Sequence, residues 1–220
     1  MSKILATKYH TQINNEILPY ASCGVTCMAM ILNWLNDKFG TTYECDDDKL
    51  FEILNSKPII DIAKELVKEG KLDKAALEYR VDNPKTVIDE SKFTHLNNFK
   101  EVLVVLGNYI TKEVFLFKEE YLSVDEIKKS IMEDMPVIIS AKFTSGGHFV
   151  TLVGYDDANN YVVDDPYGDW NKSYSSETLG RGKKLSYDIK KLSNAVTFKK
   201  LVDGVEKYQI IRIYSNFEKK

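Results

Sequence analysis

Residues 22–35 read Ser-Cys-Gly-Val-Thr-Cys-Met-Ala-Met-Ile-Leu-Asn-Trp-Leu, a strongly apolar run that begins beside a cysteine. Its large apolar residues recur at positions i, i+3, i+4 and i+7, and they are Met28, Ile31, Leu32 and Leu35. This spacing predicts a helix with one buried face, ending between Asp37 and Gly40, with Gly40 as its C-terminal cap. Cys23 then lies at the helix N-terminus, where unpaired N–H groups and the positive end of the dipole favour a thiolate. Cys23 is therefore a candidate nucleophile, although a single cysteine beside a helix is more often a small buried hydrophobe.

The composition is that of a globular protein, with 44% hydrophobic and 29% charged residues in a chain of 220. This length predicts one domain over residues 1–220, with residues 41–111 as a helical insertion or subdomain. The net charge of −3 gives no reason to expect a nucleic-acid partner. Between Asn171 and Lys220 there are twelve Lys/Arg against five Asp/Glu, a balance of +7. Such a basic region either contacts an anionic polymer or is a solvated surface.

The three cysteines, Cys23, Cys27 and Cys45, form neither a disulfide pattern nor the cluster that a zinc site requires. We expect reduced thiols, no metal and no cofactor. Residues 1–8 lack the apolar core of a signal peptide, and no segment approaches the length of a membrane span. We therefore expect a monomer made in the cytoplasm, and any action on a cell wall would follow release by another route.

The predicted secondary structure changes from mainly helix to mainly strand near the middle of the chain. Helical patterns dominate before residue 111, and a capping box at Ser123–Glu126 starts a further helix. Strands are predicted at 113–117, 136–143, 148–155, 161–165 and 207–214, with a turn over 156–160 that joins the third and fourth into a hairpin. The fold class is therefore α+β, with a helix-rich first half packed on an antiparallel sheet.

The predicted hairpin brings two chemically complementary side chains together. His148 opens its first arm and Asp165 closes the second, so imidazole and carboxylate become neighbours. A carboxylate in this position fixes the tautomer of a histidine and supports its charged form. Asp164 is adjacent to Asp165 and points to the opposite face, which leaves open which of the two is the partner. His10 and His95 compete as candidate histidines, but neither precedes a buried strand with a returning aspartate.

We expect the thiol of Cys23 to lie in the same site as His148. If the sheet packs on the first helix, His148 faces Cys23 and the two share a proton. Gln12, in the segment before the helix, would help to stabilise an oxyanion together with a backbone N–H at the helix start. Each of these residues has an ordinary structural alternative when it is taken singly.

The segments Tyr20-Ala-Ser-Cys-Gly-Val-Thr-Cys-Met-Ala-Met30, Gly147-His-Phe-Val-Thr-Leu-Val-Gly-Tyr155 and Asp165-Pro-Tyr-Gly168 resemble papain-like cysteine peptidases. The nearest group is the double-glycine (bacteriocin-processing) peptidases and their stand-alone relatives. The resemblance implies a papain-like fold, a catalytic triad of Cys23, His148 and Asp165, and Gln12 in the oxyanion hole. The quoted segments cover 24 residues of the chain, and residues 41–135 carry no motif of that group.

The segment from Asp165 to Tyr187 is similar to what is expected in cell-wall-degrading relatives, including phage endolysins. We expect substrate contacts from Gly147, Tyr167 and Trp170. Exposed aromatic rings at Tyr167, Trp170 and Tyr174 would suit a glycopeptide, and the alternative is that they only pack the loop. The expected function is hydrolysis of amide bonds in the peptides of peptidoglycan. The alternatives are a protein-directed peptidase and a non-catalytic binding module on the same fold.

Overall fold

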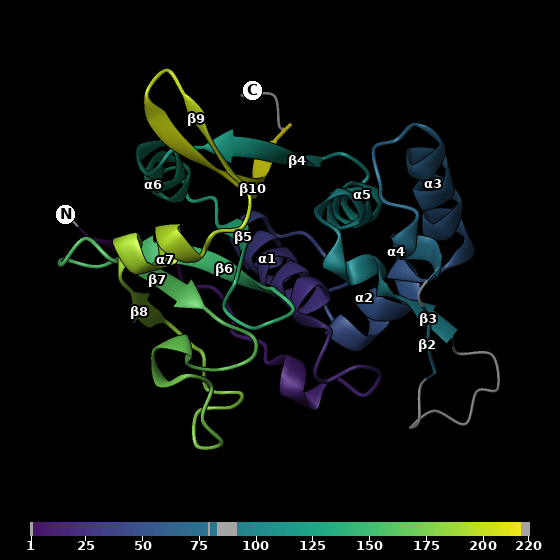
Figure 1. Ribbon diagram of the computed structural model, residues 1–220, viewed down its shortest axis with the longest axis horizontal. Helices are drawn as coiled ribbons and strands as arrows, with labels where there is room; N and C mark the ends of the chain where they lie inside the picture. Colours follow the sequence, from purple (N-terminus) through teal and green to yellow (C-terminus); the bar gives the residue numbers. More distant parts are fainter. Residues whose placement is uncertain (1, 79, 83–91, 217–220) are drawn as a thin grey trace.

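The computed structural model describes residues 2–78, 80–82 and 92–216 (Figure 1). Residue 79, residues 83–91 of the expected helical segment and residues 217–220 of the basic stretch lie outside the described residues. A mixed sheet-and-helix architecture confirms the predicted α+β class. Within the described chain, no helix combines the length and the apolar character that crossing a membrane requires.

The centre of the protein is an antiparallel sheet. Its strands lie in the order β4 (Phe115–Leu122), β10 (Val205–Ser215), β5 (Val137–Ala141), β6 (His148–Tyr155), β7 (Tyr161–Asp164) and β8 (Leu185–Tyr187). β1 (Lys3–Ile4) pairs with β6, and β9 (Lys199–Val202) forms a hairpin with β10. β2 (Arg80–Asp82) and β3 (Lys92–Thr94) make a separate small ladder.

The helices surround this sheet unevenly. α1 (Cys23–Phe39) packs against β6, α5 (Lys100–Thr111) against β4, and α6 (Val124–Met132) over β4, β5 and β6. α2 (Asp47–Leu54), α3 (Lys57–Lys68) and α4 (Ala75–Glu78) gather with α5 on one side of the molecule (Figure 1). The remaining helical elements are short: α7 (Ile189–Ala195), η1 (Gln12–Asn14), η2 (His95–Asn98) and η3 (Trp170–Lys172).

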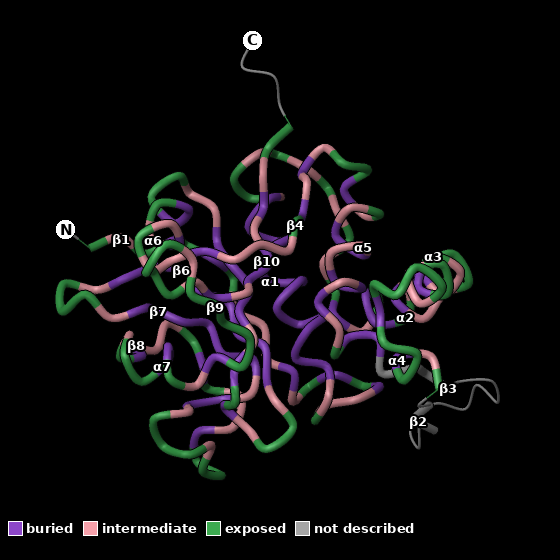
Figure 2. Tube along the Cα trace, turned by 45° about the horizontal axis from the view of Figure 1, so that its top comes forward, coloured by how far each residue is buried: buried purple, intermediate pink, exposed green. Residues whose placement is uncertain are grey.

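The predicted first helix is confirmed at both ends. It begins at Cys23, and Gly40 follows it in the left-handed conformation with φ of 67°, donating its N–H to Asn36. Gly40 is thus the expected C-terminal cap. The burial is more extensive than the predicted single face, because every residue from 23 to 35 is buried (Figure 2). The reason is that α1 lies between the sheet on one side and α2 and α5 on the other.

The hairpin is confirmed as well. β6 and β7 pair antiparallel around the turn at residues 156–160, and all eight residues of β6 are buried. The capping box of α6 is also present, with Ser123 and Glu126 bonded reciprocally. The strand expected at 113–117 begins later and runs to Leu122. Lys112 and Glu113 have φ of 48° and 61°, so they form the turn after α5 instead of strand.

Candidate active site

Cys23 is the first residue of the buried central helix. Ser22 occupies the N-cap position, but its side chain makes no capping hydrogen bond. The N–H groups of the first turn therefore have no side-chain acceptor at the cap, and they remain available to an anion beside the sulfur. The Cys23 residue is only 7% exposed, yet it lines a cleft of about 310 Å³.

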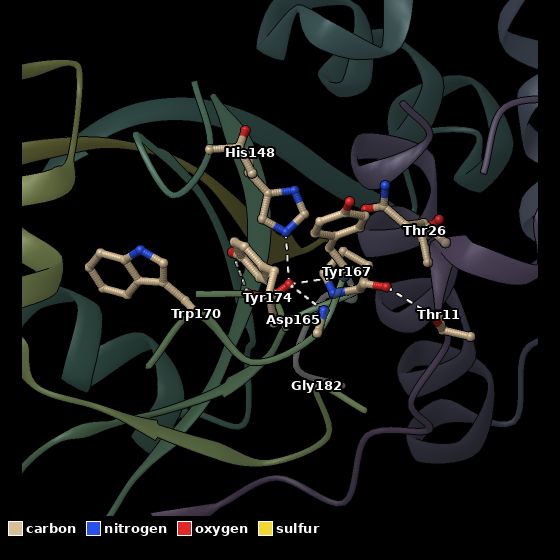
Figure 3. A network of polar contacts seen from close by, with 12 residues as sticks. Thr11, Thr26, His148, Asp165, Tyr167, Trp170, Tyr174 and Gly182 are labelled. Carbon is tan, nitrogen blue, oxygen red and sulfur yellow. Dashed lines mark hydrogen bonds and ion pairs between the residues drawn. The ribbon is translucent and has the colours of Figure 1, made fainter. Parts of the chain in front are cut away.

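His148 is the first residue of β6 and is 4% exposed. Its Nε2 lies 2.8 Å from Oδ1 of Asp165 (Figure 3). Cys23 lies close enough to His148 to contribute to the rise in the pKa of the imidazole, and both residues line the same cleft. Because Nε2 is directed at the carboxylate, Nδ1 is the ring nitrogen left for the sulfur. The structure thus brings Cys23, His148 and Asp165 into one contiguous group.

The pKa of His148 results from opposing influences. Burial has the largest single influence and lowers the pKa, since a charged imidazolium is poorly solvated inside the protein. The negative charge and hydrogen bond of Asp165, with a smaller contribution from Cys23, outweigh burial and raise the pKa to about 10. The imidazolium form of His148 therefore persists through neutral pH, as a thiolate–imidazolium pair requires.

The Asp165 carboxylate is saturated with hydrogen-bond donors. Oδ1 accepts from His148 and from the backbone N–H groups of Tyr167 (3.0 Å) and Gly168 (3.3 Å). Oδ2 accepts from the hydroxyls of Tyr174 (3.0 Å) and Tyr187 (2.8 Å). Figure 3 shows this carboxylate at the centre of the network. A fully buried carboxylate with this many donors is held in a single orientation.

The adjacent aspartate has a different set of partners. Oδ2 of Asp164 accepts from the hydroxyl of Thr7 (2.6 Å) and from Nζ of Lys184 (2.8 Å). Its Oδ1 accepts from the backbone N–H of Lys184 (2.9 Å). Adjacent residues of an extended chain point to opposite faces, so only one of the two carboxylates reaches His148. That residue is Asp165.

Gln12 is buried beside the cleft, in the short helix η1. Its backbone N–H donates to the carbonyl of Pro166 (2.9 Å), which ties η1 to the segment after Asp165. Its side-chain Nε2 donates to the carbonyl of Pro19 (3.2 Å). A primary amide carries two hydrogens and this bond uses one, so the other can point to an oxyanion in the cleft.

The cleft is formed by segments that are far apart in the sequence. Two of the predicted substrate contacts, Gly147 and Tyr167, line it. Sequence reasoning did not single out five further lining residues, which are Tyr20, Ala21, Asn98, Thr144 and Gly146. Asn98 belongs to η2, in a region without any recognisable motif, and no local pattern could have assigned it to the cleft.

Trp170 lies outside the set of described residues that line the cleft. Its ring packs against Phe143, with centroids 4.7 Å apart, and Nζ of Lys191 lies 4.3 Å above it. The side chains of Trp170, Tyr167 and Tyr174 are all partly buried, which favours the alternative in which they pack the loop. The hydroxyl of Tyr174 is held inward by its hydrogen bond to Asp165, and the ring of Tyr167 packs against that of Tyr174 with centroids 5.0 Å apart.

The other thiols and the first competing histidine are placed differently. Burial raises the pKa of the Cys27 and Cys45 thiols, which disfavours their reactive thiolate forms. Nε2 of His10 lies 2.6 Å from Nδ2 of Asn33, and burial lowers the pKa of this histidine. The His95 side chain lies outside the described part of the structure.

One group of described residues has the geometry to hold a metal ion: Asp46, Asp47 and Asp48. Asp46 caps α2 by accepting from the N–H of Lys49 (3.0 Å). Asp47 accepts from Asn15 (3.2 Å), and Asp48 accepts from the N–H of Glu16 (2.7 Å). Their oxygens thus have structural partners, and none of the three lines the cleft.

Comparisons with known proteins agree with this arrangement. A model of the Peptidase_C39 like family matches residues 4–191. A solved structure from Bacillus anthracis, provisionally assigned as a C39-like peptidase, superposes with a TM-score of 0.53 at 19% identity, covering 97% of this chain and 98% of the other. At this identity the similarity concerns the fold alone. No curated protein matches the sequence.

Proposed function

The chain belongs to the Peptidase_C39-like family, and we propose that it is a papain-like cysteine peptidase in which Cys23 is the nucleophile. The observation that carries this proposal is the pairing of Cys23 at the start of α1 with a His148 whose Nε2 is held by Asp165. His148 is the proton carrier, Asp165 orients it, and Gln12 contributes to the oxyanion hole.

The reaction begins when the Cys23 thiolate attacks the carbonyl carbon of a peptide bond. The carbonyl oxygen becomes an oxyanion, stabilised by N–H groups of the first turn of α1 and by the Gln12 amide. The imidazolium of His148 then gives its proton to the departing amine, and the C–N bond breaks to leave a thioester on Cys23. His148 next takes a proton from water, whose oxygen attacks the thioester. Release of the carboxylate product restores the thiolate–imidazolium pair.

The proposed substrate is the peptide part of peptidoglycan, which would make the protein endolysin-like. Two observations support this choice. The cleft lining contains no Lys, Arg, Asp or Glu among the described residues, which suits an uncharged stretch of peptide backbone. The basic balance of residues 171–220 suits the carboxylate-bearing stem peptides of a cell wall. Tyr167 and Gly147 would contact this substrate, and Trp170 would act only by packing the loop.

Replacement of Cys23 by Ala tests the catalytic assignment. We expect turnover of an internally quenched peptide library to fall by at least about a thousand-fold, because no other group replaces the sulfur. Iodoacetamide should alkylate Cys23 in the parent protein much faster than free cysteine, as read by mass spectrometry. Cys45→Ala is the matched control and should retain both properties. Unimpaired turnover in the Cys23→Ala variant would remove the assignment, and an unreactive Cys23 would favour a non-catalytic binding module.

Digestion of purified sacculi tests the substrate. We expect mass spectrometry to find peptide bonds of the muropeptides cut by the parent protein and intact with Cys23→Ala. Casein, incubated in parallel, reports a protein-directed activity. If casein is cut while the muropeptides stay intact, the cell-wall proposal is wrong and the protein is a protein-directed peptidase.

A further inference from the structure

Two tyrosine hydroxyls meet at the oxygen of Asp165 that faces away from His148. Tyr174 belongs to the loop after η3, and Tyr187 ends β8, so two separate segments converge on one atom. Their hydroxyls donate to Oδ2 over 3.0 and 2.8 Å. We propose that Tyr174 and Tyr187 are positioning residues, which together hold the carboxylate of Asp165 in the orientation that supports the imidazolium of His148.

Both tyrosine hydroxyls act as hydrogen-bond donors to Asp165. Burial, and after it the charge of Asp165, raises the pKa of each phenol. The hydroxyls therefore stay protonated at neutral pH and remain donors. Tyr187 is oriented in turn by the backbone N–H of Trp170, which donates to its oxygen (3.0 Å). The loop containing Trp170 is thereby connected to the candidate catalytic group.

The two carboxylate oxygens of Asp165 have different hydrogen-bond donors, and the orientation of the carboxylate depends on both sets. Oδ1 is shared by His148 and two backbone N–H groups, whereas Oδ2 depends on the two hydroxyls. Asp165 is fully buried, so Oδ2 cannot exchange a lost hydroxyl for bulk water. A buried acceptor without partners is costly, and the carboxylate would turn toward the donors that remain. Such a rotation of the carboxylate moves negative charge away from Nε2 of His148.

Titration of the His148 ring measures this effect directly. The charged or titratable groups that shift the pKa of His148 are Asp165 and Cys23, and Asp169 contributes to the raised pKa of Tyr187. In the full chain with carbon-13-labelled histidine, we expect the pKa of His148 to fall by about one unit or more in the Tyr174→Phe/Tyr187→Phe double variant. Each single variant, which keeps one hydroxyl, should show a smaller fall.

Phenylalanine is the informative substitution because it keeps the ring. The Tyr174 ring lies 5.9 Å from the ring of His148, and the Tyr187 ring lies 5.6 Å from that of Trp170, so both have packing to preserve. Tyr161→Phe is the matched control. Its hydroxyl is also buried but has no hydrogen-bond partner among the described residues, so its removal should leave the titration of His148 unchanged.

A merely structural role would lower the melting temperature of the Tyr→Phe variants and leave the pKa of His148 unchanged, and that result would overturn the inference. Failure of the double variant to fold leaves the two single variants to decide. The inference rests on the proposed function only for its catalytic consequence, a fall in kcat with KM unchanged. If Cys23 proves unreactive while the titration shifts as expected, the proposed function fails and the positioning of Asp165 stands.

Discussion

Asp164 and Asp165 show how much chemistry depends on the direction of a single side chain. The two residues are adjacent, identical and fully buried. One is neutralised by Lys184 and bound to the start of the chain, while the other receives five hydrogen bonds and faces His148. Their roles follow from the alternation of an extended chain, which sends neighbouring side chains in opposite directions. Exchange of either carboxylate would therefore affect a different property of the protein.

The pH dependence of turnover is also decided at the scale of single residues. Folding raises the pKa of His148 from 6.5 to about 10, so folding favours the protonated ring. The stabilisation from this group is fully present below about pH 6.5 and disappears as the pH rises through 10. We expect kcat/KM on the peptide library to fall as the pH rises through about 10, because the leaving amine then lacks its proton donor.

Alkylation of Cys23 by iodoacetamide is the control for that profile. It requires a thiolate but no proton donor, so its rate should not fall over the same alkaline range. A decline of turnover already near pH 6.5 would contradict the paired thiolate and imidazolium, since it would be the behaviour of an unsupported histidine.

At the scale of elements, the start of α1 is held closely against η2. A Cβ on Gly24 would lie 2.3 Å from the backbone oxygen of Asn97, and η2 also carries Asn98 into the cleft. A glycine is thus required next to Cys23 because two backbones approach too closely for any side chain. The helical region without recognisable motifs thereby contributes one wall of the candidate site.

Gly24→Ala tests this contact. Alanine favours a helix over glycine by about 1 kcal/mol, but the clash with a backbone atom should cost more. We expect a net loss of about 1–3 kcal/mol in the free energy of unfolding, measured with urea. Gly146→Ala is the control, because a Cβ there meets no atom of the described residues within 4 Å, and it should change stability by less than about 0.5 kcal/mol. Equal stability of the two variants would show that η2 can move away from α1.

At the scale of the whole molecule, a partly buried ion pair and a hydrogen bond from Thr7 connect the N-terminal segment to the sheet. Lys184 precedes β8, Thr7 belongs to the lead-in before η1, and both bond to Asp164 at the end of β7. Lys184 and the hydroxyl of Thr7 also contact each other. The N-terminal segment that carries Gln12 is therefore anchored to the sheet that carries His148.

Removal of either charge should destabilise the protein unequally. Lys184→Met leaves a fully buried carboxylate without its cation, and we expect a loss of about 3 kcal/mol. Asp164→Asn leaves a lysine whose side chain is 23% exposed and can reach water, so a loss of about 1–2 kcal/mol is expected.

Lys57→Met is the control for this pair of variants. It removes an exposed ion pair with Asp61, so it should change the unfolding free energy by less than about 0.5 kcal/mol. Urea unfolding measures the loss of unfolding free energy in each of the three variants. A greater loss in Asp164→Asn than in Lys184→Met would contradict this explanation.

Local patterns in the sequence predicted the elements that carry the candidate site. The helix starting at Cys23, the Gly40 cap, the capping box of α6 and the β6–β7 hairpin were all predicted from periodicity and turn residues. Shorter elements, namely β1, β8, β9 and α7, were not predicted. They have only two to seven residues, too few for a periodic pattern, and they form because neighbouring strands and loops hold them in place.

The sequence alone determined where the candidate nucleophile, the histidine and a returning carboxylate lie along the chain, because each is set by a pattern within a few residues of itself. The tertiary structure alone decided that Asp165 is the partner of His148, that Tyr174 and Tyr187 support it, and that Asn98 lines the cleft. These facts depend on side-chain directions and on contacts between segments far apart in the chain. Such contacts are decided by how the elements pack, and packing leaves no local pattern in a single sequence.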